Sequence, residues 1–138
     1  MKMKTKIMFG ALVVLALFCA GLTACMSLPE GGSSSTITIH YYRYDKFYDG
    51  WNLWVWPADP GDEGQGYNFG APDEEGWVTG KISIPSYVVE YGYIVRKSVP
   101  GNDWDAKDIQ EDRFARAKEI WVVTEDPRTY TSKPGIKK

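Results

Sequence analysis

Three tryptophans, Trp51, Trp54 and Trp56, fall within six residues of this chain, in the run Trp-Asn-Leu-Trp-Val-Trp. The alternative for these indoles is core packing, because large aromatics are mostly buried in small domains. By composition alone, burial and exposure are about equally expected. Side chains alternate along a strand, however, so Leu53 and Val55 share a face with Trp51, and Trp54 and Trp56 share the other. A strand of a two-layer sandwich needs only one core face. We therefore predict that Trp54 and Trp56 stand side by side on the outside, about 6.6 Å apart at roughly 3.3 Å per residue.

Other short runs alternate in the same way and are separated by glycine, proline and acidic residues. Many short strands between turn signals are typical of an antiparallel β-sandwich, so the predicted fold class is all-β. Residues 105–117 sustain neither the strand nor the helix period, and we expect a loop with a turn of helix there. The predicted strands cover residues 36–41, 51–56, 67–69, 77–84, 92–96 and 118–123.

The first 24 residues are typical of a lipoprotein signal peptide. Three lysines precede an apolar run over residues 7–20 that is too short to span a bilayer. The run leads into Leu-Thr-Ala-Cys, which resembles the bacterial lipobox, in which the cysteine, here Cys25, is lipidated and becomes the first residue of the mature protein. The alternative is an ordinary signal peptide cleaved after a small residue, with Cys25 as an unmodified thiol.

This organisation predicts where the protein is found. Residues 25–35 are rich in glycine and serine and form a flexible linker. Residues 36–132 form one domain, and residues 133–138 form a C-terminal tail. We expect the protein to be exported and anchored by lipid on Cys25 to the bacterial cell membrane, facing the extracellular side.

Charge and cysteine content exclude several functions. Beyond the signal peptide, 13 basic residues stand against 18 acidic ones, which argues against binding to nucleic acid or to anionic lipid. Of the two cysteines, Cys19 lies in the signal peptide and Cys25 would carry lipid, so none is left for a disulfide, a metal site or catalysis. All six tryptophans and nine tyrosines follow the signal peptide, a composition that favours neutral ligands that stack on rings.

Catalysis is not expected. His40 is the only histidine and lies in a predicted strand, where a structural role is more common than that of a base. The cluster Asp103, Asp105, Asp108 and Asp112 lacks the glycine and glutamate of a calcium loop, so a solvated acidic loop is expected instead. The 114 residues that follow the signal peptide also offer little depth for a glycosidase cleft. We predict a protein that is not an enzyme and has no metal and no cofactor.

Five stretches, in order and at appropriate spacing, resemble the family 41 carbohydrate-binding module, also called the bacterial pullulanase-associated domain. The resemblance covers residues 36 to about 132. The stretches are residues 39–45 (Ile-His-Tyr-Tyr-Arg-Tyr-Asp), 48–56 (Tyr-Asp-Gly-Trp-Asn-Leu-Trp-Val-Trp), 95–96 (Val-Arg), 104–114 (Trp-Asp-Ala-Lys-Asp to Asp-Arg-Phe) and 119–123 (Glu-Ile-Trp-Val-Val).

The resemblance implies an immunoglobulin-like β-sandwich that binds α-glucans such as starch, amylopectin, glycogen and pullulan without cleaving them. It places glucose stacking on Trp54 and Trp56, and hydrogen bonding to sugar hydroxyls on Lys107 and Asp112. The chemistry agrees, because an ammonium donor and a carboxylate acceptor can both hold hydroxyls at the edge of a stacked ring. The alternative for Lys107 and Asp112 is a surface ion pair, which would contribute little to stability.

Two further alternatives remain open at this point. The chain is either a free-standing glucan-binding lipoprotein, which we expect to be a monomer, or the front fragment of a pullulanase. The competing function is that of an immunoglobulin-like surface domain that binds another protein through its aromatic face.

Overall fold

The computed structural model describes residues 32–137, so the predicted signal peptide and Cys25 lie outside the described residues. Residues 32–137 contain eight strands and no helix. Accordingly, this part of the chain has no helix of the length and apolar character needed to cross a membrane. The strands are β1 (Ser34–Tyr42), β2 (Trp51–Asp59), β3 (Gln65–Asn68), β4 (Trp77–Pro85), β5 (Glu90–Val99), β6 (Asn102–Lys107), β7 (Arg113–Ala115) and β8 (Glu119–Val123).

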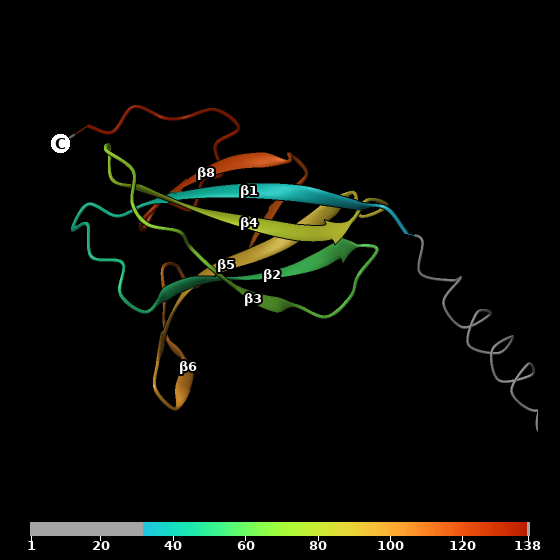
Figure 1. Ribbon diagram of the computed structural model, residues 1–138, viewed down its shortest axis with the longest axis horizontal. Helices are drawn as coiled ribbons and strands as arrows, with labels where there is room; N and C mark the ends of the chain where they lie inside the picture. Colours follow the sequence, from blue (N-terminus) through green and yellow to red (C-terminus); the bar gives the residue numbers. More distant parts are fainter. Residues whose placement is uncertain (1–31, 138) are drawn as a thin grey trace, which may run out of the picture. The chain divides into compact units, whose positions relative to one another are not determined.

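The strands form two sheets that pack face to face (Figure 1). One sheet has the order β4-β1-β8 and the other β3-β2-β5-β6, with β7 also paired to β5. The predicted all-β sandwich is therefore confirmed. Its pairs are antiparallel except for β1 and β8, which run parallel from Thr38↔Glu119 to Tyr42↔Val123.

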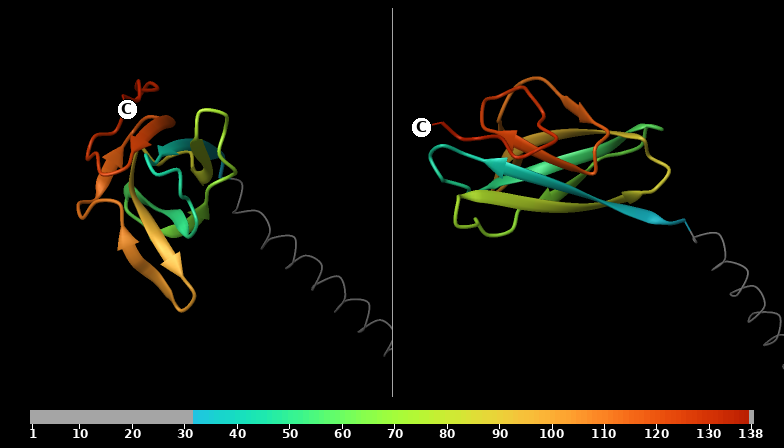
Figure 2. Two further views of the ribbon diagram at one scale, coloured as in Figure 1. Left: turned by 90° about the vertical axis from the view of Figure 1, so that its left-hand side faces the viewer. Right: turned by 90° about the horizontal axis from the view of Figure 1, so that it is seen from above.

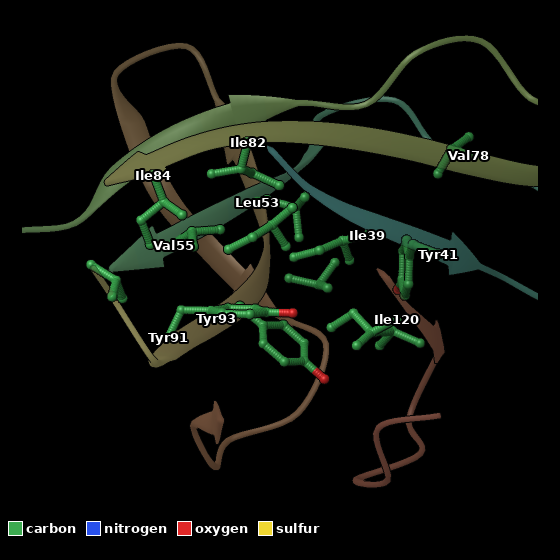
Figure 3. Packing of buried hydrophobic residues seen from close by; sticks show 14 residues of the cluster. Ile39, Tyr41, Leu53, Val55, Val78, Ile82, Ile84, Tyr91, Tyr93 and Ile120 are labelled. Atoms are coloured by element: carbon green, nitrogen blue, oxygen red, sulfur yellow. The ribbon is translucent and has the colours of Figure 1, made fainter. Parts of the chain in front are cut away.

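The core between the sheets follows the two-residue alternation of the strands. Leu53 and Val55 of β2 face Ile37 and Ile39 of β1 across an interior of aliphatic and tyrosine side chains (Figure 3). The buried set consists of Ile37, Ile39, Tyr41, Leu53, Val55, Val78, Ile82, Ile84, Val88, Tyr91, Tyr93, Val95, Ile120 and Val122.

The prediction of a helical turn within residues 105–117 is wrong. The segment instead contributes the end of β6 and the whole of β7, which both pair with β5 on its edge away from β2. The long β5 offers unpaired backbone groups at that edge, and pairing with them satisfies groups that a lone helical turn would leave exposed. The hairpin of β5 and β6 extends from the body of the sandwich, as the orange strand in Figure 2 shows.

The outer face of the three-stranded sheet is covered by the C-terminal segment. Tyr42, Trp77 and Val123 form a second buried cluster there, against which Tyr130 and Ile136 pack. This cover leaves the outer face of the five-stranded sheet as the open aromatic surface.

His40 also lies on the three-stranded sheet, with both ring nitrogens engaged. Its Nδ1 is 2.8 Å from Thr79 Oγ1, and its Nε2 is 2.8 Å from Glu119 Oε1. The ring stacks on Trp121 at a centroid distance of 4.8 Å. The side chain is therefore tied into packing between three neighbouring strands.

Candidate ligand-binding face

The two faces of β2 differ as the alternation predicts. Leu53 and Val55 are 0% and 3% exposed in the core, whereas Trp54 and Trp56 are half-buried on the opposite face. β2 lies between β3 and β5, so both indoles rest on the middle of a sheet rather than on a loop. Trp51 packs against the core, also as predicted.

Trp56 lies over a strand position that carries no side chain. Its register partner on β5 is Gly92, and a Cβ built on that glycine would lie 2.2 Å from both Cε2 and Cζ2 of the indole. The absence of a Cβ therefore lets the indole rest on the sheet. Phe114, which pairs with Gly92 from β7, meets the indole edge to face, with centroids 5.8 Å apart and planes at 87°.

Trp54 is held by neighbours on both sides. A Cβ on Gly64, in the segment before β3, would lie 2.5 Å from its Nε1. On the other side Trp104 of β6 approaches with centroids 5.6 Å apart and planes at 66°. The indole thus has a fixed orientation, which a stacking ligand requires.

Arg96 is a buried cation next to the indoles of Trp54 and Trp104. Its side chain is 7% exposed, and its Cζ lies 4.9 Å from the Trp54 ring centroid and 4.5 Å from that of Trp104. Its Nε donates to Asn52 Oδ1 at 2.8 Å, and no carboxylate of residues 32–137 is within ion-pair distance. Cation–π contact with two rings takes the place of a carboxylate in balancing this charge.

Lys107 lies beside this group at the end of β6. It is the register partner of Arg96, and its Nζ is 6.0 Å from the Trp104 ring centroid. Lys107 and Arg96 therefore both lie next to the Trp104 ring.

Asp112 is exposed in the loop between β6 and β7. It forms no ion pair with Lys107 and no hydrogen bond with any described residue, so the surface ion-pair alternative finds no support in residues 32–137. The structure brings Trp54, Trp56 and Lys107 onto one face, whereas Asp112 contacts none of them.

The loop that carries Asp112 is fastened at both ends by a buried ion pair. Arg113 Nη2 donates to Asp108 Oδ2 at 3.1 Å, and the two side chains are 3% and 1% exposed. The other oxygen of Asp108 accepts from Tyr41, Thr124 and the backbone of Glu125 at 3.0, 2.9 and 3.1 Å. The loop ends point inward, and of their neighbours Asp112 is exposed and Lys107 is half-buried.

The buried tyrosines beside this pair are held in their neutral form. Burial raises the pKa of Tyr93 to about 12, although its hydrogen bond to Thr129 and the charge of Arg113 act in the opposite direction. Burial, reinforced by the charge of Asp108, also raises the pKa of Tyr41 well above its usual range.

A hollow of about 170 Å³ opens elsewhere, at the edge of the sandwich. Val55, Tyr67, Ile84 and Pro85 are among its lining residues, and Trp54 and Trp56 are not. The candidate site is thus an open sheet face bordered by β6 and β7.

Three neighbours of the predicted site were not predicted from the sequence: Arg96, Trp104 and Phe114. A signal for Trp104 was the turn sequence Pro-Gly before it, which indicates a hairpin that returns along β5. Which face of β6 carries Trp104, however, depends on a register shift between Lys97 and Val99, and alternation does not predict such a shift.

Comparisons with known proteins agree with this geometry. The sequence model of the bacterial pullanase-associated domain matches residues 35–131. A solved structure, the product complex of the multi-modular glycogen-degrading pneumococcal virulence factor SpuA, superposes with a TM-score of 0.51 at 27% identity. The match covers 70% of this chain and 10% of that one, so the chain spans about a tenth of the length of the solved protein.

Proposed function

Because the chain belongs to the bacterial pullanase-associated domain family, we propose that its sandwich binds α-glucans such as starch, amylopectin, glycogen and pullulan without cleaving them. The observation that carries the proposal is the pair of indoles, Trp54 and Trp56, fixed side by side on the open face of β2. The C–H face of a glucose ring is apolar and lies flat on an indole, while its hydroxyls remain at the rim. Two neighbouring indoles accept two units of one chain.

Polar groups at the rim complete the proposed site. Lys107 donates to sugar hydroxyls from the end of β6, and Asp112 accepts from them out of the adjoining loop. Neither head group has an ion-pair partner within residues 32–137, so no salt bridge need be broken when a sugar binds.

Titration calorimetry of the full chain with maltotetraose tests the proposal. Trp54→Ala and Trp56→Ala should each abolish or strongly reduce the heat of binding, whereas Tyr87→Ala, an aromatic 64% exposed in the turn before β5, should not. A parent protein that gives no heat with maltotetraose and is not retained on starch gel would refute the proposal and favour the protein-binding alternative.

The polar half of the site has its own test. Lys107→Met and Asp112→Asn should each weaken binding about ten- to hundred-fold, because a hydrogen bond to a charged group contributes roughly 1.5 to 3 kcal/mol. Lys81→Met and Glu74→Gln are matched controls, since both residues are exposed on or near β4 in the other sheet. Equal affinity in the Asp112→Asn variant and the parent would remove Asp112 from the site.

The non-catalytic part of the proposal is tested by enzyme assay. Purified protein should release no reducing sugar from pullulan or glycogen over hours. Release above that of the Trp54→Ala variant would show that the chain is a glycosidase.

We also propose that lipid on Cys25 holds the module at the extracellular side of the cell membrane. The support is the sequence Leu-Thr-Ala-Cys after an apolar run. An alkyne fatty acid fed to expressing cells should label the parent and Cys19→Ala, the matched control, but not Cys25→Ala. A Cys25→Ala protein that remains labelled and in the membrane fraction would contradict this.

A further inference from the structure

The turn between β4 and β5 is an uncharged tip of the sandwich that holds two apolar side chains in water. From Pro85 onward it reads Pro-Ser-Tyr-Val-Val, and Tyr87 and Val89 are 64% and 54% exposed. Val88 between them is 5% exposed and belongs to the core. Backbone bonds close the turn, from Val88 N to Pro85 O at 3.1 Å and from Val89 N to Asp59 O at 2.9 Å. Tyr87 and Val89 are therefore held pointing away from the core.

This tip lies at the end of the sandwich where β1 begins. Ser34, the first residue of β1, pairs with Pro85, and Figure 1 shows the blue start of β1 at the same end as the arrowhead of β4. Cys25 precedes Ser34 by nine residues, and nine residues span at most about 32 Å even when fully extended. Lipid on Cys25 would therefore keep the tip close to a bilayer surface, at a high effective concentration.

The opposite end of the sandwich also exposes two rings but differs in charge. The loop between β1 and β2 follows the end of β1 and carries Tyr44 and Phe47, each 56% exposed. The same loop contains four charged residues: Arg43, Asp45, Lys46 and Asp49. Because charged groups are costly to remove from water, the uncharged tip is the better suited of the two ends to enter a lipid surface.

We propose that Tyr87 and Val89 insert into the headgroup region of the lipid surface to which the chain is anchored. The inference rests on the proposed lipid on Cys25 and adds a second contact to it. Tyrosine suits the position because its ring is apolar while its hydroxyl stays hydrated at the level of the headgroups. Two such side chains bind weakly by themselves, but the tether makes their contact intramolecular.

The charges beside the tip determine the kind of lipid. Asp59 and Glu90, which pair between β2 and β5 at the base of the turn, are both acidic. Glu90 Oε2 accepts from Arg116 Nε at 3.1 Å, whereas Asp59 has no ion-pair partner within residues 32–137. An anionic surface would repel Asp59. The contact is therefore with a neutral lipid surface, such as that of phosphatidylcholine.

Photo-crosslinking tests the contact on the lipidated protein, purified from cells and placed in phosphatidylcholine vesicles that contain a phosphatidylcholine with a diazirine near its headgroup. Peptide mass spectrometry should find lipid adducts on residues 85–89 and not on residues 43–50. In Tyr87→Ser/Val89→Ser the adducts should fall about ten-fold, which corresponds to about 1.4 kcal/mol. The matched control Tyr44→Ser/Phe47→Ser, altered at the opposite end, should react as the parent does.

Two results would overturn the inference. Equal yields of adduct at the two ends would mean that the tip is no special contact. No adduct on residues 85–89 would leave a second copy of the chain, or another protein, as the occupant of the tip. Replacing part of the phosphatidylcholine by phosphatidylglycerol should lower the yield on residues 85–89, and a higher yield would overturn the assignment to neutral lipid.

Failure of the anchor and failure of the contact are distinguishable. Protein that floats with the vesicles but gives no adduct at the tip refutes the contact and leaves lipid on Cys25 intact. Protein that carries no lipid and does not float refutes the anchor. Its Cys25 thiol can then be coupled to a maleimide phospholipid and the cross-linking repeated, so that adducts on residues 85–89 support the contact and their absence refutes it.

Discussion

The close approach between Gly92 and Trp56 makes a sharp prediction for Gly92→Ala. The added Cβ would lie 2.2 Å from the indole, whereas ordinary contact begins at 3.4 Å, so the indole must move outward by about 1.2 Å. Overpacking of this kind costs about 1 to 3 kcal/mol. Replacing glycine by alanine where φ is not positive stabilises the fold by about 0.4 to 1 kcal/mol, because it lowers the conformational entropy of the unfolded chain. Gly92 is not among the glycines with positive φ. The free energy of unfolding should therefore fall by roughly 1 to 2 kcal/mol.

The sign should reverse once the indole is removed. In a Trp56→Ala background the three closest contacts of the new methyl group are gone, so Gly92→Ala should leave stability unchanged or raise it by up to about 1 kcal/mol. Urea unfolding followed by far-ultraviolet circular dichroism gives the four free energies of this double-mutant cycle. Gly61→Ala is the control, because its Cβ would meet only Ala58 O, at 3.9 Å.

Gly92→Ala also tests whether binding requires the position of the Trp56 indole or only its presence. Gly92→Ala retains Trp56 but shifts it out of position, so affinity for maltotetraose should fall about ten-fold, corresponding to about 1.4 kcal/mol. Equal destabilisation by Gly92→Ala in both backgrounds would show that the glycine serves β5 itself and not the indole, and would refute the reasoning.

Three further outcomes are expected. Asp108→Ala leaves Arg113 buried without its carboxylate and should lower the free energy of unfolding by about 3 to 5 kcal/mol, as urea titration can show; a loss below about 1 kcal/mol would contradict the role of this pair. Because the pKa of Tyr93 is about 12 in the fold and about 10 in an unfolded chain, its contribution is complete below pH 10 and is lost between pH 10 and 12. Stability measured across that range should fall by roughly 2 to 3 kcal/mol, and by less in Tyr93→Phe. Arg96→Lys keeps the charge but loses the planar group, so the near-ultraviolet dichroism of the two indoles that it contacts should weaken; an unchanged spectrum would exclude a positioning role for the guanidinium.

Alternation carried most of the sequence prediction for β2, and it did so for a physical reason. Leu53 and Val55 have only one face on which to be buried, so the positions of Trp54 and Trp56 follow from covalent geometry. The same rule does not reach Trp104, because this residue lies in an irregular part of the β5–β6 pairing, where residues 103–105 of β6 stand opposite Ser98 alone of β5.

The segment that was expected to be a loop with a helical turn illustrates a second limit. Local periodicity reports only what a segment buries by itself, whereas β6 and β7 form because β5 offers them a free edge. The ion pair of Asp108 with Arg113 is likewise formed by two charged residues that alternation would place in solvent. Asp112, next to Arg113, is left exposed beside that pair.

The choice of binding face depends on the end of the chain. Both sheets direct tryptophans outward, Trp54 and Trp56 from one and Trp77 and Trp121 from the other, so alternation alone yields two aromatic faces. On the three-stranded sheet, backbone bonds between Trp121 and Tyr130 of 2.8 and 3.0 Å bring the C-terminal segment across that face. Trp77 is thereby reduced to 3% exposure. The five-stranded sheet has no such cover within residues 32–137, and its two indoles remain half-buried beside Gly64 and Gly92. The proposed ligand face is thus the aromatic face that the chain leaves uncovered.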